Sequence, residues 1–196
     1  MANRFRVTYL FTIASRSSKS IMKVEYISQP FPPEEKWLGY QLRSLLTGEH
    51  GQFDRFIATV AFIKLSGVSR ISSALETFRR SGGEVVIAAG IDHGGTSKQG
   101  LRSLRAVADR IFVYHDIAPQ HRTFHPKTYI FEQNRKRAVV ILGSGNMTAG
   151  GLFTNYEAHV RIELDLSDNA DDKNFFTEVM SKCAPFRTRP PRVFVS

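Results

Sequence analysis

Between Phe124 and Glu157 the chain carries residue types suited to binding and attacking a phosphate. His125 and Lys127 stand two residues apart, so both side chains point to the same face if the segment is a β-strand. A polar turn at 134–136 and an apolar run at 138–142 follow, and the run leads into Gly143-Ser144-Gly145-Asn146. If the two runs pair as a hairpin, their outer ends lie side by side. An imidazole, an ammonium, a hydroxyl, a carboxamide and small-residue backbone amides would then surround one phosphate.

These residues resemble the signature of the phospholipase D superfamily, which is His-x-Lys, an acid after four further residues, and then Gly-Ser-x-Asn. The matching positions are His125, Lys127, Gly143, Ser144 and Asn146. Glu132 stands where the family usually has Asp, and the gap between Glu132 and Gly143 is longer than is usual in the family. Glu157 resembles the additional acid of the superfamily's nucleases, among them its metal-independent restriction endonucleases.

The resemblance implies a phosphodiesterase that needs neither metal nor cofactor. Metal-free cleavage requires a nucleophile, a proton donor for the leaving oxygen, and cations or hydrogen-bond donors for the phosphoryl oxygens. In this interpretation neutral His125 attacks and forms a phosphohistidine, and Lys127, Asn146 and Ser144 stabilise the charge. Glu157 or Glu132 would accept from the far nitrogen of His125 and fix its tautomer. The sequence leaves open which of the two acids does so.

One part of the mechanism is missing from the chain. In this superfamily the leaving group takes its proton from a second histidine, which a second motif supplies, and this chain has one His-x-Lys motif. The simplest solution is a homodimer in which two copies of His125 meet across a twofold axis. One imidazole would attack and the other would protonate the leaving group.

Composition favours nucleic acid as the substrate. The 196 residues carry a net charge of +9 and the sequence pI is about 9.9, which suits a polyanionic partner. We expect DNA rather than RNA, and no stable association with a membrane, because no apolar run is long enough to span one. Cys183 is the single cysteine. A disulfide framework is therefore excluded, and a reducing, cytoplasmic location fits.

The remaining pattern predicts an α/β fold, namely a phospholipase D-like mixed, largely parallel β-sheet flanked by helices on both faces. Strands are expected at 53–65, 84–89, 111–114 and 157–164, in addition to the hairpin. Helices are expected from Pro33 to about Gly48, around 71–78, over 97–110, and around 176–183. The order strand-helix-strand-helix-strand is typical of parallel sheets.

Three segments divide the chain. Residues 1–23 form a basic N-terminal extension, 24–186 the catalytic domain, and 187–196 a basic tail rich in proline and arginine. Within the domain, four basic residues could follow a phosphate backbone, and these are Arg122, Arg135, Lys136 and Arg137.

Several alternatives remain open at this level. His115, Asp116, His121 and His125 suggest a zinc site, but their spacing matches no common ligand pattern, so we predict no metal. His93 lies after a predicted strand, where loops of α/β proteins often contact ligands, although an ordinary loop histidine is also expected there. Two other functions stay possible, a phospholipid phosphodiesterase or phosphatidyl transferase, and an inactive DNA-binding module of a restriction or helicase system.

Overall fold

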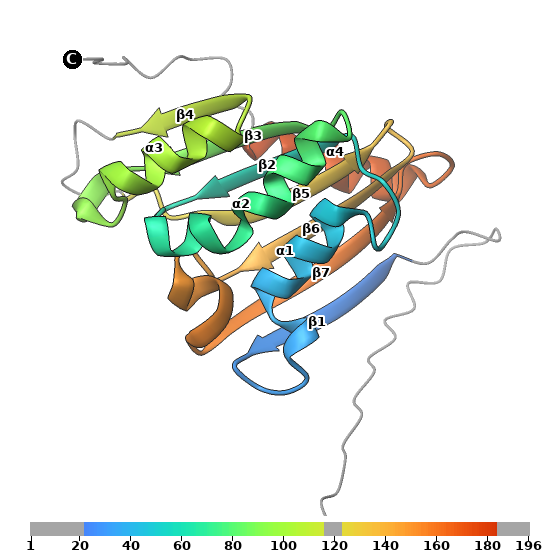
Figure 1. Cartoon of the computed structure of the whole chain (residues 1–196). Coiled ribbons are helices and arrows are strands. Elements are labelled where there is room, and N and C mark those ends of the chain that lie inside the picture. The colour runs from blue at the N-terminus through green and yellow to red at the C-terminus, as the bar shows by residue number, and fades with distance from the viewer. Residues whose placement is uncertain (1–21, 116–122, 184–196) are drawn as a thin grey trace, which may run out of the picture.

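The computed structural model describes residues 22–115 and 123–183 of the chain. Among these residues seven strands form one sheet in the order β1-β7-β6-β5-β2-β3-β4 (Figure 1). Their bounds are β1 Lys23–Gln29, β2 Arg55–Val60, β3 Glu84–Gly90, β4 Arg110–Tyr114, β5 Lys127–Gln133, β6 Arg137–Gly143 and β7 Glu157–Asp165.

The predicted strand-helix alternation is confirmed between Arg55 and Tyr114. Strand β2 pairs in parallel with β3, and β3 pairs in parallel with β4. The crossovers are α2 (Leu65–Arg80) and α3 (Lys98–Val107). Helix α2 ends before Gly82, which has a φ of +89°, and α3 begins after Ser97, whose hydroxyl accepts from the amide of Gly100 at 3.1 Å.

The prediction of a largely parallel sheet is wrong. The four other strand pairs, β1/β7, β7/β6, β6/β5 and β5/β2, are antiparallel among the described residues. The β5–β6 hairpin produces one of them, and both Asn134 and Arg135 in its turn have positive φ values, as tight hairpin turns favour. Strand β5 also runs antiparallel to β2, so the parallel pattern stops where the motif begins.

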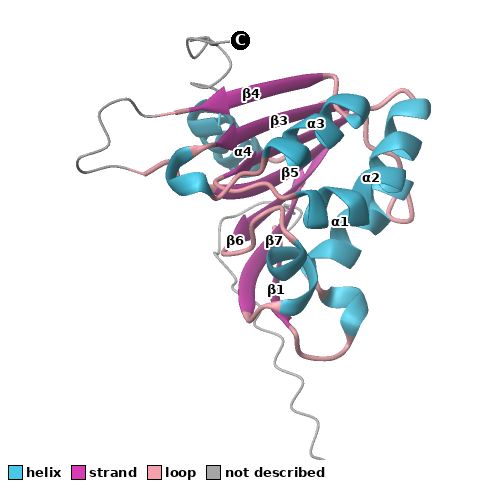
Figure 2. Cartoon of the chain, turned by 60° about the vertical axis from the view of Figure 1, so that its left-hand side comes forward, coloured by secondary structure: helices cyan, strands magenta, loops and turns pink. Residues whose placement is uncertain are grey.

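Helices cover both faces of the sheet, as predicted (Figure 2). One face packs against α1 (Leu38–Thr47), α2 and α3, and its core includes Leu42, Leu75 and Phe131. The other face packs against α4 (Ala170–Cys183), which contributes Phe176, Val179, Met180 and Cys183, the four residues expected on one helical face. Each strand of the hairpin is therefore buried on both sides, which holds the motif rigidly.

Two local predictions at the start of the domain need correction. The segment after Pro33 forms only a short 3₁₀ turn, Glu34–Lys36, and α1 begins at Leu38. Strand β1 was not expected, and it places Gln29 opposite Glu157. Gln29 is fully buried, and its side-chain oxygen accepts from the amide of Leu38 at 3.0 Å. The strand thus joins α1 to the sheet.

The two ends of the sheet carry different parts of the sequence. At one end, here called the motif end, lie the start of β5, the end of β6 and the start of β7, together with the carboxyl ends of β2, β3 and β4. The opposite end, here called the turn end, holds the hairpin turn at 134–136. The β5 strand between them spans about 20 Å at 3.3 Å per residue.

Candidate active site

His125 and Lys127 meet directly at the motif end. The Lys127 ammonium lies 2.7 Å from Nδ1 and 3.0 Å from Nε2 of His125, and donates to the His125 carbonyl at 2.9 Å. Lys127 is only 8% exposed, whereas the His125 side chain reaches the surface. The ring of Phe62 packs edge-on against the imidazole at 5.9 Å between centroids. The ammonium is therefore fixed against an accessible imidazole.

This arrangement disfavours the charged form of both side chains. Burial, and then the neighbouring Lys127 ammonium, lower the pKa of His125 below its ordinary value of 6.5. Burial also lowers the pKa of Lys127, and the charge of Glu157 works against that shift. The lowered pKa favours the neutral form of His125, which is the form that has a lone pair for attack.

Glu157 lies beside Ser144 rather than beside His125. The Ser144 hydroxyl donates to Oε2 of Glu157 and accepts from the amide of Ala158 at 3.1 Å. Nδ2 of Asn155 donates to the other oxygen of Glu157 at 3.3 Å. The Ser144 hydroxyl has one proton, and it donates that proton to Glu157. Ser144 could therefore donate to a phosphoryl oxygen, as predicted, only after its hydrogen bond to Glu157 breaks.

Asn146 is oriented by a distant part of the chain. Its side-chain oxygen accepts from the amide of Phe62 at 3.0 Å, and the backbone of Met147 bonds to both Phe62 and Lys64. These bonds attach the Gly143–Asn146 loop to the end of β2. Because the carboxamide oxygen is occupied, the NH₂ group of Asn146 is the part that remains as a donor for a ligand.

Two buried residues that sequence reasoning missed support the same loop. His159 is 1% exposed, and its Nε2 accepts from the amide of Gly145 at 3.1 Å, while the Tyr129 hydroxyl donates to the carbonyl of Gly145 at 3.0 Å. Burial lowers the pKa of His159 to about 4, partly offset by Glu157. Each residue lies two positions after a motif residue, so strand alternation from Lys127 and Glu157 could have found both.

The glycines of the loop are required by close packing. A Cβ on Gly143 would lie 2.4 Å from the carbonyl oxygen of Ala158, and one on Gly145 would lie 2.5 Å from that of Gly151. Neither oxygen belongs to a side chain that can move away. The small residues therefore let the loop lie directly on β7 and on the segment after Asn146, which fixes Ser144 and Asn146 relative to Lys127.

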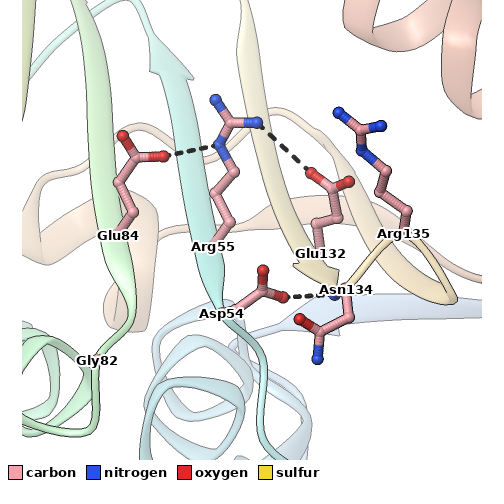
Figure 3. A pocket seen from close by; sticks show the side chains of 7 residues that line it. All are labelled: Asp54, Arg55, Gly82, Glu84, Glu132, Asn134 and Arg135. Atoms are coloured by element: carbon pink, nitrogen blue, oxygen red, sulfur yellow. Dashed lines mark hydrogen bonds and ion pairs between the residues drawn. The ribbon is translucent and has the colours of Figure 1, made fainter.

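Glu132 is removed from the candidate orienting acids by its position (Figure 3). It lies at the turn end of β5, where its carboxylate pairs with Arg55 at 3.6 Å. Glu132 also lies five residues after Lys127 on the same strand, so its side chain points to the opposite face of the sheet. Glu132 lines a polar pocket with Asp54, Arg55, Gly82, Glu84, Asn134 and Arg135. Its carboxylate is thus held by Arg55 at the end of β5 that is far from His125.

The predicted basic phosphate contacts are not gathered at the motif. Arg135 and Lys136 lie in the exposed hairpin turn, and Arg137 donates to the carbonyl of His50 at 2.8 Å and pairs with Glu163 at 3.4 Å. All three belong to the turn end. Arg122 lies outside the described residues.

The described residues contain no group of three or more His, Cys, Asp or Glu side chains arranged to hold a metal. His115, one of the four residues of the zinc hypothesis, pairs instead with Asp92, and Asp116 and His121 lie outside the described residues. No helix within the described ranges is both long and apolar enough to cross a membrane.

Comparison with known proteins identifies the fold. No family model and no curated protein matches the sequence. Among solved structures, the chain is similar to Nuc from Salmonella typhimurium, a phospholipase D family member, with a TM-score of 0.54 and 16% identity over 83% of this chain and 94% of Nuc. It is also similar to phosphatidylserine synthase from Haemophilus influenzae, with a TM-score of 0.59 and 12% identity over 87% of this chain and 40% of that protein. The chain is similar as well to yeast tyrosyl-DNA phosphodiesterase, with a TM-score of 0.54 and 12% identity over 85% of this chain and 38% of that protein.

These likenesses define an α/β protein with the phospholipase D fold, and the resemblance noted from the motif is confirmed at the level of the fold. The match to Nuc covers nearly the full length of that protein. The residues that gave the resemblance lie together at one end of the sheet, where His125 contacts Lys127 and Ser144 contacts Glu157. Chemically, the site offers a neutral imidazole, a fixed ammonium and an amide donor.

Proposed function

We propose that this protein is a metal-independent nuclease that cleaves DNA through a phosphohistidine intermediate at a site shared by two subunits. The observation that carries the proposal is the contact between Lys127 and His125, at 2.7 and 3.0 Å from the two ring nitrogens. A phosphoryl group bonded to either nitrogen would have an oxygen within reach of the ammonium. The same contact favours the neutral, nucleophilic form of the ring.

The first step would form a bond between phosphorus and the unprotonated ring nitrogen of His125 and break the bond between phosphorus and the leaving oxygen. Lys127 and the NH₂ group of Asn146 would stabilise the negative charge on the non-bridging oxygens. In the reacting dimer one copy of His125 would be neutral and attack, and the partner's His125 would be protonated and give its proton to the leaving oxygen. In the second step water would attack the phosphohistidine and give its proton back to that imidazole, which releases His125.

The choice of nucleic acid rests on charge. The net charge of +9 favours a polyanion, and similarity to a tyrosyl-DNA phosphodiesterase is consistent with DNA. Glu157 acts in this proposal through Ser144 and through its charge near Lys127 rather than as the partner of the imidazole.

The test is cleavage of plasmid DNA in excess EDTA by the wild type, by His125→Ala and by His50→Ala. His50 is an exposed histidine whose carbonyl contacts Arg137 at the turn end, so it is a matched control. We expect the wild type and His50→Ala to cleave and His125→Ala to lose at least a thousandfold in rate. Equal cleavage by His125→Ala would overturn the mechanism, and DNA binding with no turnover would favour an inactive binding module.

The shared site has its own test. Sedimentation of the active protein should show a dimer, and heterodimers of wild type with His125→Ala should lose most of their turnover because they hold one nucleophile and no acid for it. A fully active monomer would contradict the shared site while leaving the nucleophile assignment intact.

A phospholipid phosphodiesterase or phosphatidyl transferase is the second candidate, because the chain is also similar to a phosphatidylserine synthase. Turnover of phosphatidylcholine vesicles, abolished by His125→Ala and accompanied by no action on DNA or RNA, would move the assignment to this class.

A further inference from the structure

A second set of polar side chains lies at the motif end, on β3 and β4 rather than on the motif strands. The Ile91 amide donates to the carbonyl of Tyr114 at 3.1 Å, which places the residues that follow the two strands side by side. These residues are Asp92 and His93 after β3 and His115 after β4. The mechanism proposed above uses none of them.

Asp92 and His115 form a carboxylate–imidazole pair. Nδ1 of His115 lies 2.7 Å from Oδ1 of Asp92. The Asp92 side chain is 7% exposed, whereas that of His115 is 57% exposed. The second carboxylate oxygen of Asp92 is buried and has no hydrogen-bond partner among the described residues. The buried carboxylate therefore orients the ring, and the exposed part of the ring is left for a ligand.

His93 lies between this pair and the motif. Its Nε2 is 3.1 Å from the hydroxyl of Thr123, two residues before His125. The same loop contacts Phe62, since a Cβ on Gly95 would lie 2.0 Å from the Phe62 ring, and that ring packs on His125. The loop after β3 is thus continuous with the candidate active site.

The spacing of the strands decides which role the pair can have. The sheet order is β5-β2-β3-β4, and neighbouring strands lie about 4.8 Å apart, so β3 and β4 are about 10 and 14 Å from β5. That separation is too long for direct proton transfer to an oxygen leaving the phosphorus at His125. It suits another phosphate of the same strand, a few nucleotides from the scissile one, since charges repeat every ~3.4 Å along each strand of a duplex.

We propose that His115, oriented by Asp92 and flanked by His93, is a subsite that binds a phosphate of the polynucleotide beside the scissile phosphodiester. When a phosphate approaches, the imidazolium of His115 donates from Nδ1 to Asp92 and from Nε2 to a phosphate oxygen. This inference rests on the proposed nuclease function, and it specifies that the natural substrate extends over several nucleotides. A substrate with a single phosphate would not reach the subsite.

The first experiment measures binding, so that it does not depend on catalysis. A fluorescein-labelled single-stranded oligothymidylate is titrated with the wild type, His115→Ala, His115→Arg and the control His50→Ala. We expect His115→Ala to weaken binding roughly three- to tenfold, as for one partly exposed charge-assisted hydrogen bond, and to reduce the slope of log K against log salt by about 0.7. His115→Arg should keep the affinity, because it retains a cationic donor. Unchanged affinity in His115→Ala would overturn the subsite.

The second experiment separates the subsite from the chemistry. Hydrolysis of bis(p-nitrophenyl) phosphate, which has one phosphodiester, should be unchanged in His115→Ala, whereas kcat/KM on oligothymidylates of increasing length should rise less than in the wild type. Equal losses on both substrates would show that His115 serves catalysis or the fold instead. If the wild type hydrolyses neither substrate, the nuclease proposal fails, and the binding titration still decides whether the phosphate subsite exists.

Discussion

The two ends of the sheet handle charge in opposite ways. At the turn end, Arg55 pairs with Glu84 at 3.0 Å and with Glu132 at 3.6 Å (Figure 3). Glu84 also contacts Arg110. At the motif end, buried Lys127 takes part in none of the ion pairs found among the described residues, and its nitrogen contacts an imidazole instead. The turn end pairs its clustered carboxylates with arginines, and the motif end leaves a buried cation next to an imidazole.

This difference separates structure from function. A buried ammonium without a paired carboxylate costs folding free energy, because it has lost its hydration. Such a group is retained where a ligand supplies the missing anion, and a phosphodiester does so. The ion pairs of the turn end need no ligand, although that end holds a polar pocket. We therefore expect substitutions at the motif end to affect activity more than stability, and the reverse at the turn end.

Among the substitutions that test this comparison, Lys127→Ala should have the largest effect. Removing the cation takes away stabilisation of the phosphoryl oxygens, and we expect kcat/KM for DNA cleavage to fall by an amount equivalent to about 2–4 kcal/mol, as for oxyanion-hole donors. Stability in urea should change little or improve. Single-turnover kinetics beside urea denaturation would measure both. Loss of stability in proportion to activity would show that Lys127 is mainly structural.

His159 provides the next test, through pH. Its pKa in the folded state, about 4, is below the ordinary 6.5, so the unfolded chain binds the extra proton first as the pH falls. The contribution of neutral His159 to the free energy of unfolding is fully present above pH 6.5 and is lost progressively between pH 6.5 and about 4. The loss should approach about 3 kcal/mol.

His159→Gln is the variant for this measurement, because its side-chain oxygen can still accept from the amide of Gly145. Urea denaturation across the acid range should show a shallower fall in stability for His159→Gln than for the wild type. Parallel curves would mean that His159 does not stay neutral in the folded protein.

The sequence was sufficient for the parts of the fold that depend on local pattern. Periodicity predicted β2-α2-β3-α3-β4 and the β5–β6 hairpin, because each element buries its own face. It could not predict that β5 pairs with β2 and β1 with β7, since strand direction between segments distant in sequence is set by packing. The prediction of a largely parallel sheet failed for that reason.

In the candidate site, too, the sequence predicted what depends on local spacing and missed the contacts between distant segments. His125 and Lys127 were predictable because they are two residues apart, and Glu132 could have been excluded by the same alternation, since it lies an odd number of positions from Lys127. The bond from Phe62 to Asn146 joins residues 84 positions apart. No spacing rule reaches that far, so the support of the Gly143–Asn146 loop became visible only in the structure.

A smaller effect is expected from Arg55→Ala at the turn end. The change leaves Glu84 with Arg110 but removes the partner of Glu132, which is 8% exposed. We expect a loss of stability of about 1–3 kcal/mol, as for an unsatisfied buried acceptor, and cleavage within about twofold of the wild type. The double variant Arg55→Ala, Glu132→Gln should recover part of the stability. A loss of cleavage in properly folded Arg55→Ala would contradict the separation of the two ends.

The smallest effect should come from the basic hairpin turn, which the sequence suggested as a phosphate contact. Arg135→Gln and Lys136→Gln remove two exposed charges without changing side-chain length greatly. The turn lies about 20 Å along β5 from Lys127, and charges separated by more than the Debye length of about 8 Å at physiological salt are largely screened. DNA affinity at that salt should therefore change less than about twofold, and cleavage should not change. If the double variant binds DNA much more weakly and with a lower salt slope, the nucleic acid must extend across the sheet to the turn end. The arginine and lysine there would then bind phosphate as the sequence first indicated, and the division between the two ends would hold for the chemistry but not for binding.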